Sequence, residues 1–300
     1  MSEPVQISVV IPVYNEAKTI GEVLRRVLNC GLDTEVIVVD DASTDGTREY
    51  LQGLNYSQIH RLYHEVNRGK GAALRTAFAA TRRPYVVVQD ADLEYDPKDY
   101  RAVLEPLIDG RADMVFGSRF LGGPHRVLFF WHYVGNRLLT LASNLACNLN
   151  LTDMETGMKA FRRDKLMTLK LTADRFTFEP EITARAARAR WRIYEVPISY
   201  SGRTYAEGKK IGARDAIAAF GAICYYRFCR LNDGLGQRHL GPTVVSHELP
   251  DTLTVKAKTK SDSGGFLRED EGDDSSVKPF AVQSGPRKRG ESALAATDDR

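Results

Sequence analysis

The stretch from Val86 to Pro97, VVVQDADLEYDP, constrains the fold more than any other part of the sequence. Tyr85 and the three valines after it form an unbroken apolar run, which is typical of α/β-sheet strands buried on both faces. The run ends in Asp90 and Asp92, one residue apart. Because ligands of open α/β sheets bind beyond the carboxyl ends of the strands, we expect this pair to hold a hard divalent cation that bridges it to a diphosphate. A solvated turn rich in aspartate would show the same short motif. The choice between a cation site and such a turn therefore depends on the other segments of the sequence.

Apolar strands alternate with helical segments along the first part of the chain. Strands are expected at residues 7–12, 36–39, 59–63, 85–89 and 114–117, and helices at 16–28, 45–54, 70–80 and 97–108. Ser43 or Thr44 is expected to cap the second helix. This order predicts an α/β fold with a mainly parallel sheet covered by helices. The segment GKGAALRTA supplies only G-x-G, so the motifs for dinucleotide and P-loop binding are both incomplete.

Composition narrows the class of protein. A chain of 300 residues with 43% hydrophobic content can bury one sizeable core. A net charge of +3, without a dense basic stripe in the first 200 residues, argues against nucleic-acid binding. The four cysteines form no C-x-x-C pair, as expected of reduced thiols in a cytoplasmic protein. A secretory signal and an apolar run of the ~18 to 20 residues that cross a bilayer are both lacking, so we expect a soluble or peripheral protein.

The character of the sequence changes after Leu231. Gly, Ser, Asp and Lys dominate from there on, and segments such as TKSDSGG and EDEGDDSS show no hydrophobic periodicity. We therefore expect a catalytic domain over residues 1–231, ending in an amphipathic helix at about 213–231, and a disordered tail over 232–300.

Three predicted strand ends carry polar clusters: PVYNE at 12–16, VDDAST at 39–44 and QDADLE at 89–94. Neighbouring parallel strands end on one rim, so these clusters and the loop at 67–70 should surround one crevice. There Tyr14 could pack on a base, Asp41 could accept hydrogen bonds from base or ribose, and Lys70 could lie near a phosphate.

Five motifs carry a resemblance to a known family. PVYNE, VVDDASTDGT, NRGKGAALRTA, DADLEYDP and GSRF follow one another in the order and spacing of family 2 glycosyltransferases, which have the nucleotide-sugar-binding GT-A fold. The resemblance spans roughly residues 5 to 230. The second half, through METGMKAFRR, FEPEITARAARA and RIYEVPISYSGRTYAEGKKI, is similar to dolichol-phosphate mannose synthases and related polyprenyl-phosphate glucosyltransferases.

The resemblance implies roles for individual residues. Nucleotide-sugar binding is implied for Pro12, Tyr14, Glu16, Asp41, Asp90 and Ala91, beside Lys70. Binding of Mg²⁺ or Mn²⁺ is implied for Asp90 and Asp92, joined by Glu94, which stands where many lipid-phosphate members have glutamine. Catalytic roles are implied for Asp92, Arg119 and Arg137, the two arginines holding the acceptor phosphate.

The chemistry of a phosphate acceptor points the same way. A phosphate monoester has a second pKa of about 6 and needs no general base to become a nucleophile. It needs positive charge, which Arg119, Arg137, Arg203, Lys209 and Lys210 could supply, and an in-line displacement that inverts the anomeric centre. A hydroxyl acceptor would instead need a base, for which Asp153 and Glu155 are the candidates.

Membrane contact is suggested by two apolar helical stripes. One runs from the aromatic residues at 129–133 to Leu149, and the other from Ile217 to Leu231 beside basic residues. Such stripes usually pack on their own domain, so core packing is the alternative. The segment 203–212 is expected to be a lid.

Together these features predict an inverting enzyme at the cytoplasmic face of a membrane. It would transfer mannose or glucose from GDP-mannose or UDP-glucose to a polyprenyl or dolichyl phosphate. One alternative is transfer to a hydroxyl acceptor, and another is a catalytically silent nucleotide-sugar-binding protein.

Overall fold

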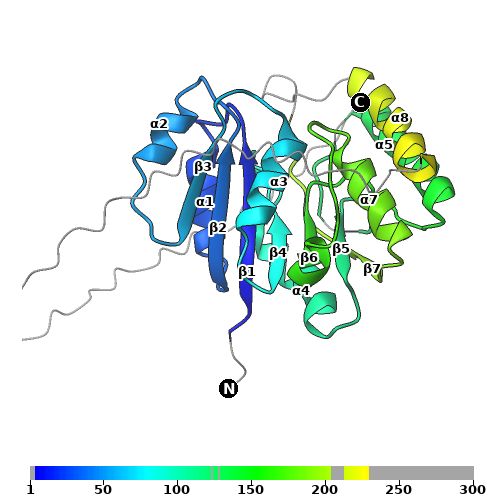
Figure 1. Cartoon of the computed structure of the whole chain (residues 1–300), viewed down its shortest axis with the longest axis horizontal. Helices are drawn as coiled ribbons and strands as arrows, with labels where there is room; N and C mark the ends of the chain where they lie inside the picture. Colours follow the sequence, from blue (N-terminus) through cyan, green and yellow to red (C-terminus); the bar gives the residue numbers. More distant parts are fainter. Residues whose placement is uncertain (1–3, 123, 128, 204–212, 230–300) are drawn as a thin grey trace, which may run out of the picture. The chain divides into compact units, whose positions relative to one another are not determined.

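A computed structural model describes residues 4–122, 124–127, 129–203 and 213–229 of the chain (Figure 1). In this part, the strands form one sheet in the order β3-β2-β1-β4-β6-β5-β7. They are β1 (Gln6–Val13), β2 (Asp33–Asp40), β3 (Ile59–Tyr63), β4 (Tyr85–Val88), β5 (Met114–Ser118), β6 (Lys159–Arg162) and β7 (Ile193–Pro197). Only β6 runs antiparallel to its neighbours, β4 and β5. The predicted α/β class and the mainly parallel sheet are confirmed.

Helices cover both faces of this sheet (Figure 1). They are α1 (Ile20–Leu28), α2 (Thr47–Gln52), α3 (Lys70–Ala80), α4 (Tyr100–Ile108), α5 (Phe130–Cys147), α6 (Arg163–Leu166), α7 (Phe178–Arg188) and α8 (Ala213–Phe228). The helices α1 and α4 pack on one face. The helices α3, α5, α7 and α8 pack on the other face, where α8 contacts both α5 and α7.

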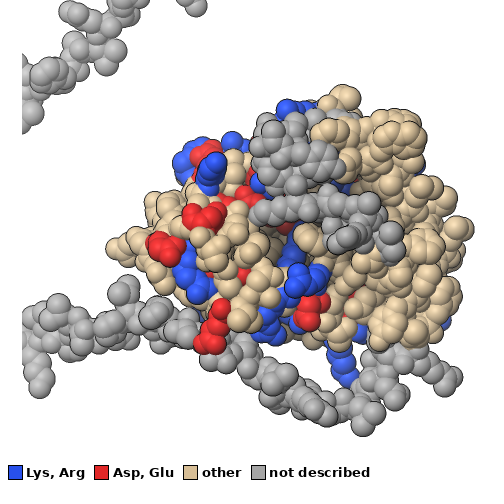
Figure 2. Space-filling model, turned by 90° about the horizontal axis from the view of Figure 1, so that it is seen from above, with Lys and Arg blue, Asp and Glu red and all other residues tan. Residues whose placement is uncertain are grey.

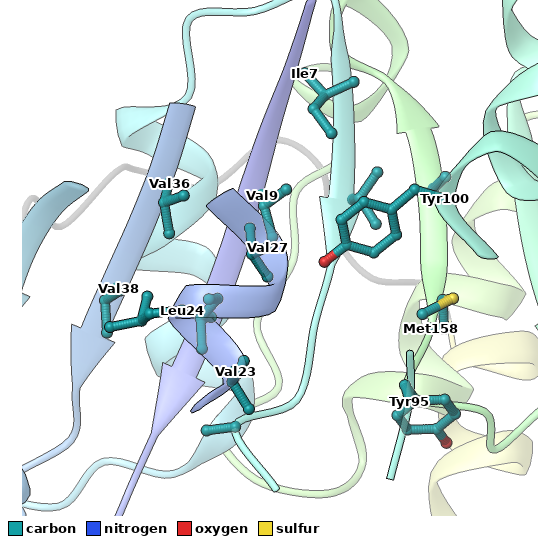
Figure 3. Packing of buried hydrophobic residues seen from close by; sticks show 14 of the residues in the cluster. Ile7, Val9, Val23, Leu24, Val27, Val36, Val38, Tyr95, Tyr100 and Met158 are labelled. Carbon is teal, nitrogen blue, oxygen red and sulfur yellow. The ribbon is translucent and has the colours of Figure 1, made fainter. Parts of the chain in front are cut away.

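Alternation of side chains along the strands produces these two cores. On β1, Val9 belongs to the core beneath α1, whereas Val10 belongs to the core beneath α3. Figure 3 shows Val23, Leu24 and Val27 of α1 packed against valines of β1 and β2. Because the central strands are buried on both faces, only their ends are left to carry polar groups.

The start of α2 differs from the sequence prediction. Its N-cap is Gly46, with φ 96°, so the expected cap by Ser43 or Thr44 is wrong. Instead, Ser43 Oγ accepts a hydrogen bond of 2.9 Å from the backbone N–H of Asn15, and the backbone N–H of Thr44 donates to Asn15 Oδ1 at 2.8 Å. These hydroxyl-bearing residues therefore join two of the predicted strand-end clusters.

The C-terminal predictions are tested only in part. The domain boundary at residue 231, the tail over 232–300 and the segment 204–212 of the expected lid lie outside the described residues. The division into domains therefore stays a prediction. Within the described ranges, none of the helices has the length and apolar character that crossing a membrane requires.

A buried hydrogen bond fixes the turn that follows β4. Tyr100 and Gln89 are both fully buried, and the Tyr100 hydroxyl donates to Gln89 Oε1 at 2.9 Å. The Gln89 amide nitrogen in turn donates to the carbonyl oxygens of Asp90 and Tyr95. Tyr100, the first residue of α4, thus holds the turn that carries Asp90 in place.

We expect Tyr100→Phe to lower the free energy of unfolding by about 1–3 kcal/mol, because it leaves Gln89 Oε1 buried without a donor. Urea unfolding followed by circular dichroism measures this change. Tyr56→Phe is the control, since the Tyr56 side chain is 53% exposed and should give a change close to zero. Equal changes for the two variants would contradict the role of the Tyr100 hydroxyl.

Candidate functional site

A cavity of about 950 Å³ opens at the carboxyl ends of β1, β2 and β4. Figure 2 looks down on this rim and shows acidic and basic side chains interspersed on it. All three predicted strand-end clusters reach the cavity, through Pro12 to Glu16, Asp41, and Asp90 to Glu94. Its lining includes Pro12, Tyr14, Glu16, Asp41, Lys70, Asp90, Ala91, Asp92, Glu94, Arg119 and Arg203. The structure therefore brings together most of the residues singled out from the sequence.

Asp41 holds the loop that precedes α3. Its Oδ2 accepts from the backbone N–H of Gly69 at 2.7 Å, and its Oδ1 accepts from the backbone N–H of Arg68 at 2.9 Å and lies 2.7 Å from His64 Nδ1. Burial alone would raise the pKa of Asp41, but these hydrogen bonds outweigh burial and lower it. Asp41 borders the cavity as an ionised anchor of the loop.

Gly69, just before α3, and Gly71, in the first turn of α3, allow this part of the chain to approach the segment that precedes α7. Gly69 has φ 97°, and a Cβ there would overlap the carbonyl oxygen of Asp174. A Cβ on Gly71 would overlap the carbonyl oxygen of Ala173. The G-x-G of the sequence therefore serves close packing between two chain segments.

Lys70 forms an ionic bridge at the floor of the cavity. Its Nζ lies 2.9 Å from Asp90 Oδ1 and 3.2 Å from Glu179 Oε1. Burial would lower the pKa of Lys70, but the two carboxylates raise it well above its ordinary value, so the amine is charged. A Cβ on Gly157 would overlap Asp90 Oδ2 and press on the Tyr95 ring, so only glycine allows Asp90 to lie here.

Arg203 provides the positive charge beside Asp92. Its guanidinium lies 3.0 Å from Asp92 Oδ2, 3.1 Å from Glu16 Oε2 and 3.6 Å from Glu94 Oε1. Burial and the carboxylates of Asp90 and Glu94 raise the pKa of Asp92 to about 7, whereas Arg203 opposes that rise. The carboxylates around Asp92 are therefore only partly compensated by the residues that the structure describes.

The donor chemistry of Asp90 and Asp92 suits a hard divalent cation. Mg²⁺ is commonly held by one or two carboxylates together with substrate phosphates. Among the described residues, however, no group of three or more His, Cys, Asp or Glu side chains is placed to hold a metal ion. Glu94, the third expected ligand, instead accepts from the Tyr200 hydroxyl at 2.9 Å and from the backbone N–H of Arg203 at 2.9 Å.

Arg119 is anchored by a buried carboxylate. Asp153 is fully buried and accepts from Arg119 Nε at 2.6 Å and from Nη2 at 2.7 Å. The guanidinium also lies over the Tyr200 ring, 5.2 Å from its centroid. Burial would lower the pKa of Arg119, but Asp153 raises it well above the ordinary value, so a fixed cation faces the cavity.

The other predicted acceptor residues are placed differently. Arg137 is exposed, donates to the carbonyl oxygen of Thr152 at 3.2 Å and is not among the cavity-lining residues. Lys209 and Lys210 lie outside the described residues. Of the predicted acceptor cations, the structure thus brings Arg119 and Arg203 to one cavity.

Sequence reasoning did not single out Glu179 or Tyr95, which also line the cavity. Glu179 is the Glu of FEPE and lies in the first turn of α7, where a carboxylate interacts favourably with the helix dipole. It adjoins Glu155, whose pKa rises to about 8 because of burial and the charge of Glu179, against the opposing effect of Lys159. In the sequence, the FEPE segment at the start of a helix is the feature that could have pointed to Glu179.

The apolar stripes of α5 and α8 are divided between core and surface: Ala142 and Leu149 pack against the core, whereas most of the large apolar side chains of the stripes are exposed. On α5 the buried residues are Thr140, Ser143 and Cys147, whereas the exposed ones include Trp131, Leu138, Leu141 and Leu145. Phe220, Tyr225 and Phe228 are exposed on α8. Figure 2 shows a broad area with few charged side chains on its right, where these helices lie in Figure 1. Trp131, Gly135 and Leu139 of α5 also line the cavity, so α5 borders both surfaces.

Two relatives are about a third identical to this chain over the aligned residues. It is 33% identical over 215 residues to the undecaprenyl-phosphate mannosyltransferase of Micrococcus luteus, covering 68% of this chain and 86% of the relative. It is 31% identical over 204 residues to the glycosyltransferase AglJ of Haloferax volcanii, covering 68% of this chain but only 65% of AglJ. A third, the polyprenol monophosphomannose synthase of Mycolicibacterium smegmatis, is 29% identical over 71% of this chain and 83% of its own.

Solved structures support the fold of these relatives, and a family model supports their family. The glucosyl-3-phosphoglycerate synthase of Mycobacterium tuberculosis, solved with Mn²⁺, UDP and phosphoglyceric acid, superposes with a TM-score of 0.60 at 23% identity, covering 83% of this chain and 87% of that one. This likeness confirms the GT-A fold. The model of glycosyl transferase family 2 matches residues 8–170, more than half of the chain. With motifs, fold and cavity all in accord, the chain belongs to the family 2 glycosyltransferases.

Proposed function

We propose that this glycosyltransferase transfers a hexose, mannose or glucose, from a nucleotide diphosphate sugar to a polyprenyl phosphate, with inversion at the anomeric carbon. The observation that carries the proposal is that Arg119 and Arg203 line the same cavity as Asp90 and Asp92. Two relatives named for undecaprenyl-phosphate and polyprenol mannosyl transfer support it. The donor nucleotide is GDP or UDP.

The carboxylate end of the cavity serves the donor. Tyr14 is 39% exposed at its edge and offers a ring for the base, while Asp41 keeps the loop before α3 in place. Asp90 and Asp92 would hold Mg²⁺ or Mn²⁺, which when bound stabilises the departing nucleoside diphosphate. Lys70 is charged and lies beside Asp90, where it adds positive charge near the diphosphate.

The arginine end serves the acceptor phosphate. Asp153 engages Nε and Nη2 of Arg119 and so leaves Nη1 to donate to a phosphate oxygen. Arg203 reaches the same cavity from the segment after β7. A dianionic phosphate held between these cations is already nucleophilic, so positioning it in line with the anomeric carbon is the main task of the protein.

The rival reaction, transfer to a hydroxyl, depends on a general base. Asp153 is fully buried, paired with Arg119 and not among the cavity-lining residues, so it fits an anchor and not a base. Glu155 does line the cavity, and its pKa of about 8 is in the range that a base requires. A hydroxyl acceptor would therefore use Glu155.

The exposed apolar side chains of α5 and α8 fit a peripheral membrane surface. Trp131 is 78% exposed, Leu145 78% and Phe228 70%. Soluble monomers rarely expose large contiguous apolar patches, and aromatic side chains favour the membrane interface. Because α5 also borders the cavity, the phosphate group of a lipid phosphate can enter the cavity there while the hydrocarbon chain of the lipid stays in the cytoplasmic leaflet.

Release of nucleoside diphosphate tests the proposed reaction. We expect release from GDP-mannose or UDP-glucose only when Mg²⁺ or Mn²⁺ and a short polyprenyl phosphate are both present, because the lipid phosphate is the nucleophile. Release with a soluble alcohol but not with the lipid phosphate would establish the rival acceptor. Asp92→Ala should abolish turnover and metal-dependent donor binding. Nucleotide binding by Asp92→Ala that equals wild type, without turnover in either protein, would establish a silent binding protein.

Removing the anchor of Arg119 should cost stability as well as activity. We expect Asp153→Asn to lower the free energy of unfolding by about 3–5 kcal/mol, because it leaves a buried guanidinium without its carboxylate. Asp164→Asn is the control, since its pair with Arg162 is exposed and worth at most about 1 kcal/mol. Denaturant unfolding measures both. Equal small losses would show that Asp153 does not hold Arg119 in place.

Vesicle binding tests the apolar face. We expect the double variant L141E/L145E to bind vesicles of phosphatidylcholine and phosphatidylglycerol at least tenfold more weakly than wild type in co-sedimentation, because two charges would enter the lipid boundary. Ile108→Glu, at a residue 45% exposed on α4, is the control and should bind like wild type. Vesicle binding by L141E/L145E at the wild-type level would exclude α5 as the contact.

A further inference from the structure

Two glutamates at the cavity each have a carboxylate oxygen that the rest of the described chain does not satisfy. They are Oε1 of Glu155 and Oε2 of Glu179, each without a hydrogen-bond partner among the described residues. Both residues line the cavity, and Glu179 is only 4% exposed. A buried polar oxygen without a partner is costly, so such atoms are expected to be satisfied by whatever fills the site.

The side chain of Glu179 is fixed in place on two sides. It begins in the first turn of α7, where the helix dipole favours its negative charge. Its other oxygen, Oε1, lies 3.2 Å from Lys70 Nζ, which also binds Asp90 at 2.9 Å. The Glu179 carboxylate, and with it Oε2, is therefore linked to Asp90 through Lys70.

Glu155 is held on the loop between α5 and β6. The next residue, Thr156, donates from Oγ1 to the carbonyl oxygen of Gly117 at 2.6 Å. The residue after that, Gly157, is the one on which Asp90 packs. Both glutamates are thus positioned through neighbours of Asp90, although they come from different segments.

The chemistry of this pair selects an uncharged ligand with several hydroxyl groups. Two carboxylates repel an anion. A cation is disfavoured because Lys70 already pairs with Glu179. A hydroxyl donates a hydrogen bond to a carboxylate oxygen without adding charge. A group with neighbouring hydroxyls satisfies both oxygens at once.

We infer that Glu155 and Glu179 bind the hydroxyl groups of the hexose in the donor and so select which sugar is transferred. This inference rests on the proposed function, which places the donor diphosphate at Asp90 and Asp92. The sugar attached to that diphosphate then lies over Lys70 and reaches the two unsatisfied oxygens. Glu155 and Glu179 are sugar-binding residues in this assignment, and the nucleotide is bound elsewhere in the cavity.

Calorimetry on the full chain with Mn²⁺ separates sugar binding from nucleotide binding. We expect Glu179→Gln and Glu155→Gln each to weaken the affinity for the nucleotide sugar about tenfold or more, the order of a hydrogen bond to a charged group. Affinity for the matching nucleoside diphosphate should stay within about twofold of wild type. Glu105→Gln, at a side chain 73% exposed, is the control and should change neither affinity.

Deoxy-sugar donors provide the sharper comparison. If Glu179 accepts from one hydroxyl, the donor lacking that hydroxyl binds wild type more weakly but binds Glu179→Gln as well as the complete donor does. Additive losses for every deoxy position would overturn the inference, as would equal losses for nucleotide and nucleotide sugar. Glu179→Asp provides a second variant if the glutamine protein fails to fold, and it should show the same loss confined to the sugar.

The outcome also distinguishes this inference from the proposed function. A wild-type chain that binds neither GDP-mannose nor UDP-glucose overturns both. A wild-type chain that binds and transfers the sugar, beside Glu155 and Glu179 variants with unchanged sugar affinity, overturns only the assignment of the two glutamates.

Discussion

Compensation of buried negative charge is the constraint on which the site depends. Among the described residues, seven carboxylates line one cavity: Glu16, Asp41, Asp90, Asp92, Glu94, Glu155 and Glu179. Burial together with neighbouring carboxylates raises the pKa of Asp92, beside Asp90 and Glu94, and that of Glu155, beside Glu179. Lys70 compensates Asp90 and Glu179, whereas Arg203 compensates Glu16, Asp92 and Glu94. The fold therefore has to bring cations from α3 and from the segment after β7 to the ends of β1 and β4.

Close backbone packing makes this arrangement possible. Gly157 lets Asp90 lie against the loop before β6, and Gly69 and Gly71 let the start of α3 lie against the segment that precedes α7. The same contacts place Lys70 between Asp90 and Glu179. Small residues at these points thus set the positions of charged ones. A larger side chain at Gly157 or Gly71 would displace backbone or a buried carboxylate, neither of which can move cheaply.

The sequence predicted the strand ends well because they depend on local patterns. An apolar run followed by Asp90 and Asp92 specifies a buried strand and the edge where it stops. The pairing of Arg119 with Asp153 could not be found in this way, because the two residues are 34 positions apart and meet only through β5 and the loop before β6. Glu179 was missed for the same reason. The exposure of most of the α5 stripe was also not decided by periodicity, because an apolar stripe does not show whether it covers a core or a surface.

Arg203 links the two halves of the proposed reaction. Asp92 Oδ2 accepts from Arg203 Nη2 at 3.0 Å, and Asp92 would also help to hold a divalent cation with the donor. Two positive groups on one carboxylate repel each other, so a cation at Asp90 and Asp92 weakens the hold of Asp92 on Arg203. Glu16 and Glu94 keep the guanidinium in the cavity, where a phosphate oxygen becomes its better partner. Within the proposed function, binding of the donor with its cation therefore favours binding of the acceptor phosphate, and the coupling follows from the charges alone.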